Sequence, residues 1–520
     1  MPAVPLLDIN TALGRTTRAP CGFDSPRLLL DEMARLGIHE ALVYHVLAAE
    51  ADVTLGNRLL IEQLDGCADL YPCWVMAPSA LGDLPGPTAW VREALAVGVR
   101  AVRLFPRHSL YTLAEWCVGP LLAELENAGL PVLIDFGPRH WSERVVPWDH
   151  LDTLCRRHPG LNVVIIGATV GETRDAVSLV RRWPNLFLEF HAFNLPDGLS
   201  LLAKQGLAHK LLFGTGMPLR AGECVTTQTV RSGLSPEDLA AVSGGNAREL
   251  LNVTGPRDTG QGNARHMAGV DGLVVDAHAH AGAWERTITP VRTPEDIVRS
   301  MDRCGVHKMV VSSFAAIHGE MRDGNQQTER LTAQFPDRLY GYAGINPHYP
   351  EELDNELSQC FDRAANFVGL KFHCGLHNAP VQYGGYERAL VFANERGLPV
   401  LVHASGNDDW PRVTRRYPHA AFIIAHACAW DGWDPAGAEA YRPVRDIANL
   451  YVDVAGSAAH RGALRALLEL VGADKVLFGS DFPMFDLAFE FGRVASSDLA
   501  AKDKAAICGA NARRIFTRMR

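Results

Sequence analysis

The chain has 520 residues, of which 47% are hydrophobic and 21% charged, and its formal net charge is −9. This length predicts two domains, and the acidic balance argues against a nucleic-acid-binding surface, which needs a basic face. The N-terminal segment has no basic region followed by an apolar stretch, and no apolar run reaches about 18 residues, so we expect neither a signal peptide nor a membrane span. The 11 cysteines include no C-x-x-C pair, which is typical of a cytoplasmic protein with reduced thiols.

The first half of the chain is repeated in the second half. Asp8 in PLLDIN matches Asp276 in LVVDAH, an offset of 276 − 8 = 268. The repeat predicts two related domains, 1–253 and 272–520, joined by a polar, glycine-rich linker at 254–271. Further matches follow in the same order at this or a slightly shorter offset: Gly37-Ile38-His39 with Gly305-Val306-His307, Gly56-Asn57 with Gly324-Asn325, Pro131-Val132-Leu133 with Pro399-Val400-Leu401, and the segments beginning at Lys210 and Lys475.

Short apolar runs alternate with longer amphipathic stretches in each half. Thr293 followed by Pro294, for example, predicts a helix N-cap and first turn. Eight βα units in about 250 residues are typical of a (β/α)8 barrel, so we predict an α/β fold with two tandem (β/α)8 TIM-type barrels. The strands expected in the second half are Leu273–Ala277, Lys308–Ser312, Leu339–Ile345, Phe367–Phe372, Pro399–Val402, Ala421–Ala425, Leu450–Val454 and Lys475–Gly479.

Polar side chains end four of these strands. His278 and His280 end the first, where residues two apart point the same way. His403, His426 and Asp481 end the fifth, sixth and eighth. A single histidine at such a place is more often a hydrogen-bonded core residue. Four strands with such ends meet at the mouth of one barrel, so together they predict a site for one divalent metal ion, zinc before manganese or iron.

The first half lacks these candidate ligands, although the apolar scaffold around them is repeated. This contrast indicates that the ligands serve a metal and that the first barrel is a degenerate copy, a pseudo-enzyme. The replacements are Asn10 for His278, Ala12 for His280, Asp135 for His403, Gly167 for His426 and Gly216 for Asp481.

The second half resembles the amidohydrolase-related family that includes aminocarboxymuconate-semialdehyde decarboxylase and γ-resorcylate decarboxylase. The resemblance implies that His278, His280, His403 and Asp481 bind the metal and that His426 contacts the substrate or the attacking oxygen. The matching segments are Asp276-Ala277-His278-Ala279-His280, Gly369-Leu370-Lys371-Phe372, Leu398-Pro399-Val400-Leu401-Val402-His403, Ala425-His426, Leu477 to Pro483 and Asn511 to Phe516.

Lys371 allows two interpretations. In binuclear members of the wider superfamily, a lysine on the fourth strand is carboxylated and bridges two metal ions, and Lys371 lies at about that place. Otherwise its ammonium group binds an anionic substrate or a nearby carboxylate. The decarboxylase branch implies one metal ion, which we favour.

The ligand set predicts a metal-dependent hydrolase that attacks an amide, ester, lactone or thioester with an activated water. Asp481 would accept the proton of the water and His426 would stabilise the developing oxyanion. Non-oxidative decarboxylation of a small unsaturated or aromatic acid is the alternative enzyme function. A non-catalytic binding or scaffold protein is the third hypothesis.

Loop residues around the expected mouth indicate a small aromatic or carboxylate-bearing substrate, although each of them could equally serve loop packing. They are Trp284, Arg286, His373, His377, Trp430 and Trp433. Homodimers are common in the family, so the first barrel could replace a partner subunit in cis through Gly171-Glu172-Thr173-Arg174, with further homo-oligomerisation left open.

Overall fold

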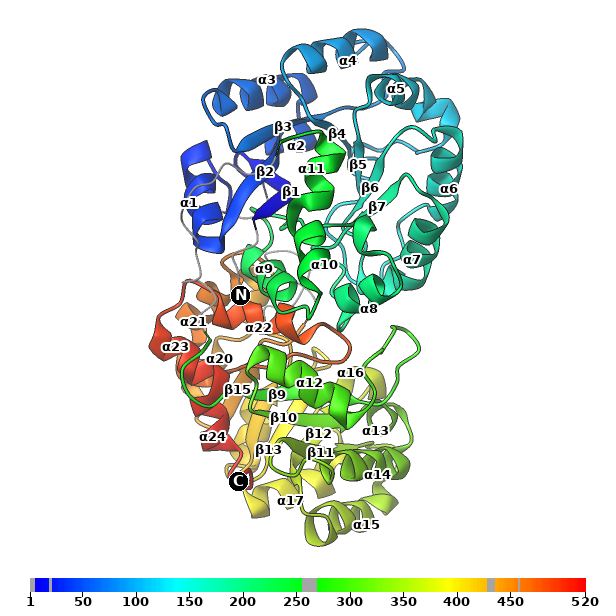
Figure 1. Ribbon diagram of the computed structural model, residues 1–520. Helices are drawn as coiled ribbons and strands as arrows, with labels where there is room; N and C mark the ends of the chain where they lie inside the picture. Colours follow the sequence, from blue (N-terminus) through cyan, green and yellow to red (C-terminus); the bar gives the residue numbers. More distant parts are fainter. Residues whose placement is uncertain (1–4, 18–20, 255–268, 428–434, 457–458) are drawn as a thin grey trace. The chain divides into compact units, whose positions relative to one another are not determined.

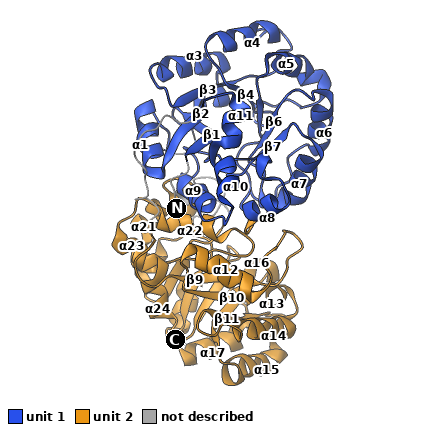
Figure 2. Ribbon diagram, viewed as in Figure 1, with its two compact units in different colours: residues 1–194, 198–267 blue, residues 195–197, 268–520 orange. Residues whose placement is uncertain are grey.

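The computed structural model describes residues 5–17, 21–254, 269–427, 435–456 and 459–520 (Figure 1). The chain divides into two compact units, one of Met1–Asn194 with Gly198–Met267 and the other of Leu195–Asp197 with Ala268–Arg520 (Figure 2). Most of the predicted linker at 254–271 lies outside the described residues.

The first unit is a parallel eight-stranded barrel in the order β1 to β8. It closes where Ile9 N donates to Phe213 O (3.0 Å) and Ala12 N to Met217 O (3.0 Å). Its strands are β1 Leu6–Leu13, β2 Ile38–His45, β3 Leu70–Val75, β4 Ala101–Leu104, β5 Val132–Asp135, β6 Val163–Ile166, β7 Leu186–Glu189 and β8 Leu211–Leu212. Its α-helices are α1 Pro26–Leu36, α2 Val46–Glu50, α3 Val53–Leu64, α4 Pro87–Ala96, α5 Glu115–Ala128, α6 Trp148–Arg157, α7 Thr173–Arg182, α8 Gly198–Lys204, α9 Gly222–Val230, α10 Pro236–Ala240 and α11 Asn246–Leu251.

The second unit repeats this barrel with the order β9 to β16. Ala277 N donates to Phe478 O (2.9 Å) and closes it in the same way. Its strands are β9 Val275–Ala281, β10 Lys308–Ser313, β11 Leu339–Ile345, β12 Phe367–His373, β13 Pro399–His403, β14 Ala421–Ile424, β15 Leu450–Asp453 and β16 Val476–Leu477. Its α-helices are α12 Pro294–Cys304, α13 Phe314–His318, α14 Met321–Thr332, α15 Leu353–Ser358, α16 Cys374–His377, α17 Glu387–Arg396, α18 Trp410–Arg416, α19 Pro435–Glu439, α20 Pro443–Asp446, α21 Ala463–Val471, α22 Leu487–Ala495, α23 Ala501–Ala505 and α24 Asn511–Ile515.

Both predicted (β/α)8 barrels are therefore confirmed, and the strands differ from expectation chiefly at their ends. β9 continues past the predicted end at Ala277 and includes His278 and His280. β16 is shorter than predicted and ends at Leu477, and the chain turns further on at Asp481, whose φ is 58°. The N-cap at Thr293 is present, and its side chain accepts from Asp296 N at 3.2 Å.

The repeated Gly-Asn pairs mark helices that pack closely on each barrel. A Cβ atom at Gly56 would lie 2.2 Å from Ala48 N, and one at Gly324 would lie 2.2 Å from Ala316 N, so only glycine fits. The next residue, Asn57 or Asn325, pairs with both backbone groups of a strand residue, as in the 2.8 Å bond from Gly344 N to Asn325 Oδ1. The repeated Gly-Asn pair in the sequence therefore corresponds to a helix-to-strand contact that is present in both barrels.

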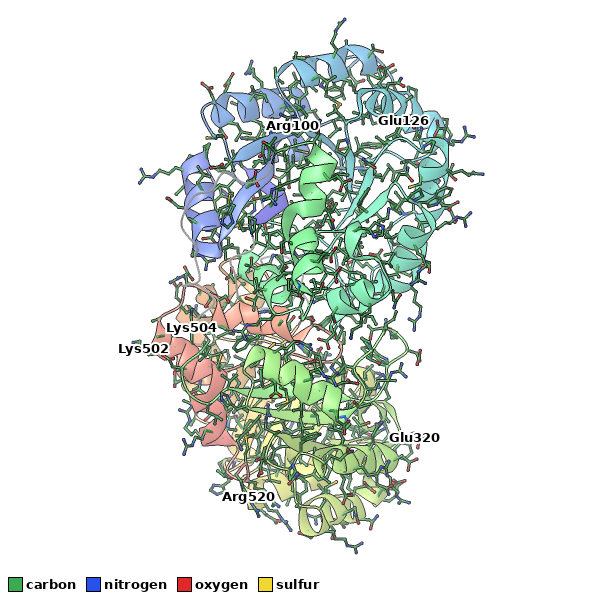
Figure 3. All side chains as sticks on the ribbon, in the orientation of Figure 1. Arg100, Glu126, Glu320, Lys502, Lys504 and Arg520 are labelled. Atoms are coloured by element: carbon green, nitrogen blue, oxygen red, sulfur yellow. The ribbon has the colours of Figure 1, made fainter. Side chains whose placement is uncertain are left out.

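Apolar side chains fill each barrel and seal one end of it. In the second barrel, Val275, Ala277 and Leu401 pack with Ile515 and Phe516 at the end of the chain. Charged side chains such as Glu320 and Lys502 lie at the outer surface (Figure 3). Among the described residues, no helix is both long and apolar enough to span a bilayer.

Candidate metal centre

The ends of β9, β12, β13 and β15, with the turns after β14 and β16, bring a group of buried polar side chains together. The pairing of β9 with β10 shifts between Met309 and Val311. Because of this irregularity, Ala277 packs inside the barrel and Ala279 outside it. The shift changes which residues of β9 face inward, as a β-bulge does, and leaves His278 and His280 together at the mouth.

His278 is held between two carboxylates. Its Nδ1 lies 2.9 Å from Asp453 Oδ2, and its Nε2 lies 3.5 Å from Asp481 Oδ1. Since Asp453 accepts a hydrogen bond, Nδ1 carries the proton and Nε2 is left with a lone pair. This carboxylate–histidine pair is the arrangement that orients a metal-binding imidazole. Burial, followed by the charge of Lys371, lowers the pKa of His278 to about 3, which keeps the ring neutral.

His280 lies against Asp481 in the same group. Its Nδ1 lies 3.2 Å from Ser312 O and 3.1 Å from Ser312 Oγ, so this nitrogen can donate to the carbonyl or accept from the hydroxyl. Its Nε2 lies 2.9 Å from Asp481 Oδ1 and donates to that carboxylate when Nδ1 accepts from Ser312. Burial lowers the pKa of His280, so a second proton on this ring is disfavoured. In the tautomer that leaves Nε2 unprotonated, Nε2 and Asp481 Oδ1 both offer lone pairs to which a divalent metal ion can bind.

Asp481 is the shared carboxylate of this group. Burial alone would raise its pKa, but the hydrogen bond from His280 and the nearby histidines outweigh burial and hold the pKa well below the usual range. The candidate ligand atoms of His278, His280 and Asp481 all lie within 4.8 Å of one another, and so do those of His278, His426 and Asp453.

His403 and His426 complete the group. His426 Nδ1 lies 3.1 Å from Ala455 O, and its Nε2 lies 3.0 Å from His403 Nδ1. His373 stacks on His403 with 4.0 Å between ring centroids, and burial lowers the pKa of both well below the ordinary value. Neutral imidazoles gathered around one carboxylate suit a divalent ion of borderline softness.

Lys371 also lies in this group, and it is only 1% exposed. Its Nζ donates to His278 Nε2 at 2.8 Å, so a positive charge already lies beside the proposed ligand nitrogen. Burial lowers the pKa of Lys371 to about 8.

The predicted loop residues lie less close to this group. Trp284 contacts Phe314 and His318, and Phe314 in turn stacks on His280 at 4.7 Å. The exposed Arg286 lies over the Trp284 ring at 5.7 Å. His377 is fully engaged with Tyr386 Oη and Ile317 O, which makes it a packing residue. Trp430 and Trp433 lie outside the described residues.

Sequence reasoning missed Asp453. Its signal is an acidic residue at the end of an apolar run, but the first half has an acidic residue, Glu189, at the matching place, so the contrast between the halves is absent. Its Oδ1 accepts from His426 N (2.9 Å) and Ala455 N (3.0 Å), so one carboxylate holds His278, His426 and its own turn.

The mouth of the first barrel carries different groups. Arg103, at the place of Lys371, makes an ion pair with Asp135 and donates to Asn10 Oδ1 at 2.7 Å. Glu172, in the segment predicted to act in cis, is buried in an ion pair with Arg139 of the same barrel. Of the described residues, only those in the second barrel form a cluster able to hold a metal ion.

Comparison with known proteins gives two kinds of match. A family model described as Amidohydrolase matches residues 19–253 and again residues 275–518. The 3'-5' ssDNA/RNA exonuclease TatD of Pantoea vagans (strain C9-1) is 26% identical over 210 residues, which are 36% of this chain and 73% of the relative. The TatD exonuclease of Erwinia tasmaniensis is 23% identical over 202 residues, with the same coverage.

Solved structures with similar coordinates cover about half of this chain. An uncharacterized TIM-barrel protein from Bordetella bronchiseptica has 20% identity and a TM-score of 0.39, covering 48% of this chain and 99% of its own. A dihydroxybenzoic acid decarboxylase from Polaromonas sp. JS666, with bound manganese and 2-nitroresorcinol, has 17% identity and a TM-score of 0.39. The match covers 48% of this chain and 98% of the decarboxylase.

Proposed function

The chain belongs to the amidohydrolase family, and from this premise we propose that its second barrel is a metal-dependent hydrolase of a small carboxylate-bearing or aromatic substrate. The observation that carries the proposal is the cluster of His278, His280 and Asp481, whose candidate ligand atoms lie within 4.8 Å of one another beside a His278 ring oriented by Asp453. Two imidazoles and a carboxylate gathered in this way can bind one divalent cation.

His278, His280, His403 and Asp481 would hold the ion, and we propose zinc because imidazole nitrogens dominate the set. When bound, zinc supplies a Lewis acid that polarises a carbonyl group and activates water. A second ion would require carboxylated Lys371. Without that modification, the Lys371 ammonium group would bind the anionic end of a substrate.

Asp481 would act as the general base. The interactions that hold its pKa well below the usual range keep it ionised at neutral pH, so it can accept a proton from water and pass it to the leaving group. The hydrogen bond between Asp453 and His278 would hold the His278 ring in place during this transfer.

His426 would stabilise the oxyanion that develops on the substrate carbonyl. Its backbone N–H donates to Asp453 and its Nδ1 donates to Ala455 O, so Nε2 would have to carry a second proton, as imidazolium, to donate to the oxyanion. Such preorganised groups contribute most where water is excluded, and His426 is only 7% exposed.

Non-oxidative decarboxylation is the second candidate, and Lys371 favours it. A buried cation beside the proposed metal ligands could hold the carboxylate that the substrate loses. Carbon dioxide release from aromatic acids, measured beside hydrolysis of the corresponding esters and lactones, separates the two reactions. Cleavage of single-stranded oligonucleotides belongs in the same assay set, because the matching relatives are named exonucleases.

Elemental analysis tests the metal proposal first. We expect about one zinc ion per chain in the wild type and almost none in His278→Ala. Asn10→Ala, the same replacement at the matching place of the first barrel, should keep the metal and serves as the control. About two ions per chain would indicate a binuclear site through Lys371. No metal in protein purified with zinc present would overturn the enzyme proposal and favour a scaffold.

A further inference from the structure

The mouth of the first barrel encloses a cavity of about 540 Å³, a volume typical of small-molecule sites. Side chains from the ends of several strands line it, including Asn10, Arg103, Asp135 and His191. It occupies the part of the first barrel that corresponds to the candidate metal centre of the second.

The loss of side chains opens this cavity. Gly167 and Gly216 lie at the places of His426 and Asp481, and both have a φ of 71°. A Cβ atom at Gly216 would lie 2.8 Å from His191 Cδ2 and 2.9 Å from Arg220 Cγ. The two glycines therefore make room for side chains that the second barrel does not have there.

The buried charged groups on the floor of the cavity neutralise one another without a metal ion. Arg103 donates to Asp135 through Nε (3.2 Å) and Nη2, and its guanidinium lies 4.4 Å from the centre of the Tyr44 ring. Glu189 contacts His191 Nδ1 at 2.7 Å and accepts from Asn10 Nδ2 at 3.2 Å. Because a permanent cation fills the place of Lys371, a divalent metal ion is disfavoured here.

The walls combine arginines with aromatic rings, a composition that suits an anion with an apolar body. Among the described residues, four arginines and two carboxylates line the cavity, with the aromatic rings of Tyr44, Phe105 and Phe136 between them, while Glu143 and Glu172 pair with Arg107 and Arg139 from outside the lining. The second independent observation is Arg139, whose side chain is 1% exposed. Its Nη2 pairs with Glu172, but its Nε is buried with no hydrogen-bond partner among the described residues. A buried guanidinium donor without an acceptor is costly; Arg139 lines the cavity, and a ligand oxygen would satisfy its Nε once the side chains that cover this atom shift.

We propose that the first barrel binds a small organic carboxylate with a planar apolar body in this cavity, without a metal ion. The carboxylate would accept from Arg139, and the rings of Tyr44 and Phe105 would contact the body. This site does not depend on the function proposed for the second barrel.

Calorimetric titration of the full chain with benzoate tests the proposal. Arg139→Lys keeps the charge opposite Glu172 but removes the Nε donor, and we expect it to weaken benzoate binding roughly tenfold or more. Gly167→Asn places a side chain in the cavity at a backbone conformation that asparagine tolerates, and should abolish binding. Arg181→Lys, the same replacement at an exposed site on α7, should have no effect.

Near-UV circular dichroism checks that each variant is folded. No benzoate binding at about 10 mM would overturn the proposal. So would binding that survives both cavity substitutions, because that benzoate would lie elsewhere in the chain. Inorganic phosphate, titrated in parallel, distinguishes the ligand class: binding of phosphate in place of benzoate would contradict an apolar-bodied carboxylate.

Discussion

Replacing Asp453 by asparagine isolates the part that this carboxylate plays in metal binding. Asp453 Oδ2 accepts from His278 Nδ1 at 2.9 Å, while Oδ1 accepts from two backbone N–H groups. Asparagine can keep Oδ1 for those two bonds. Its amide group then faces His278 Nδ1 and donates to it, which moves the proton of the ring to Nε2. The nitrogen proposed to bind the metal would lose its free lone pair.

We expect Asp453→Asn to weaken metal binding by roughly 10- to 100-fold, the usual cost of losing a partner behind a ligating histidine. This corresponds to about 1.4–2.8 kcal/mol of binding free energy. Competition with a chromophoric zinc chelator measures the affinity, and circular dichroism checks the fold. Glu189→Gln makes the same change at the matching place of the first barrel and should leave zinc affinity unchanged. Wild-type affinity in Asp453→Asn would refute the assignment of the His278 tautomer.

Three further predictions concern stability. Burial raises the pKa of Asp8 to about 6 from 3.8. Protonated Asp8 therefore favours the folded state, and this contribution of about 3 kcal/mol to the free energy of unfolding is complete below about pH 4 and is lost as the pH rises through 6. Urea midpoints at about pH 4.5 and 7.5 should therefore differ less in Asp8→Asn than in the wild type. Gly324→Ala would place a Cβ atom against Ala316 N and should cost roughly 3 kcal/mol of unfolding free energy, whereas Gly384→Ala, which meets no atom within 4 Å, should be nearly neutral. Removing the metal with EDTA should lower the melting temperature of the second barrel by on the order of 5 °C or more and leave the transition of the first barrel unchanged; equal shifts of both transitions would contradict a metal site confined to one barrel.

The barrels could be predicted because their signals are local and repeated. Apolar runs that end in polar residues define the strands, and the repeat confirms each element through its counterpart. The histidines at the ends of β9 and β13 could be identified for the same reason, since parallel strands end at one mouth. Asp453 gave a weaker signal, because the first half has an acidic residue, Glu189, at the matching place and the contrast between halves is absent there.

Other features depend on contacts that a sequence does not display. Strict alternation along β9 places Asp276, His278 and His280 on one face, but the shift in pairing with β10 lets Ala277 pack inside the barrel as well. Trp284 packs against Phe314, one ring away from His280, because loop conformation is set by the neighbouring helix. The in-cis role of the segment around Glu172 stays a prediction.

The two barrels balance buried charge at the same place in different ways. In the second barrel, Lys371 and several imidazoles lie around Asp481, and we propose that a divalent cation completes the group. In the first, Arg103 and Asp135 form an ion pair. A guanidinium cannot release its charge or coordinate a metal ion, so arginine in place of lysine disfavours metal binding at this mouth. We propose that the cavity beside Gly167 and Gly216, which is bordered by arginines, binds an anion through hydrogen bonds instead. The two proposals together predict that the exchanged residues change what this mouth binds and do not simply inactivate it.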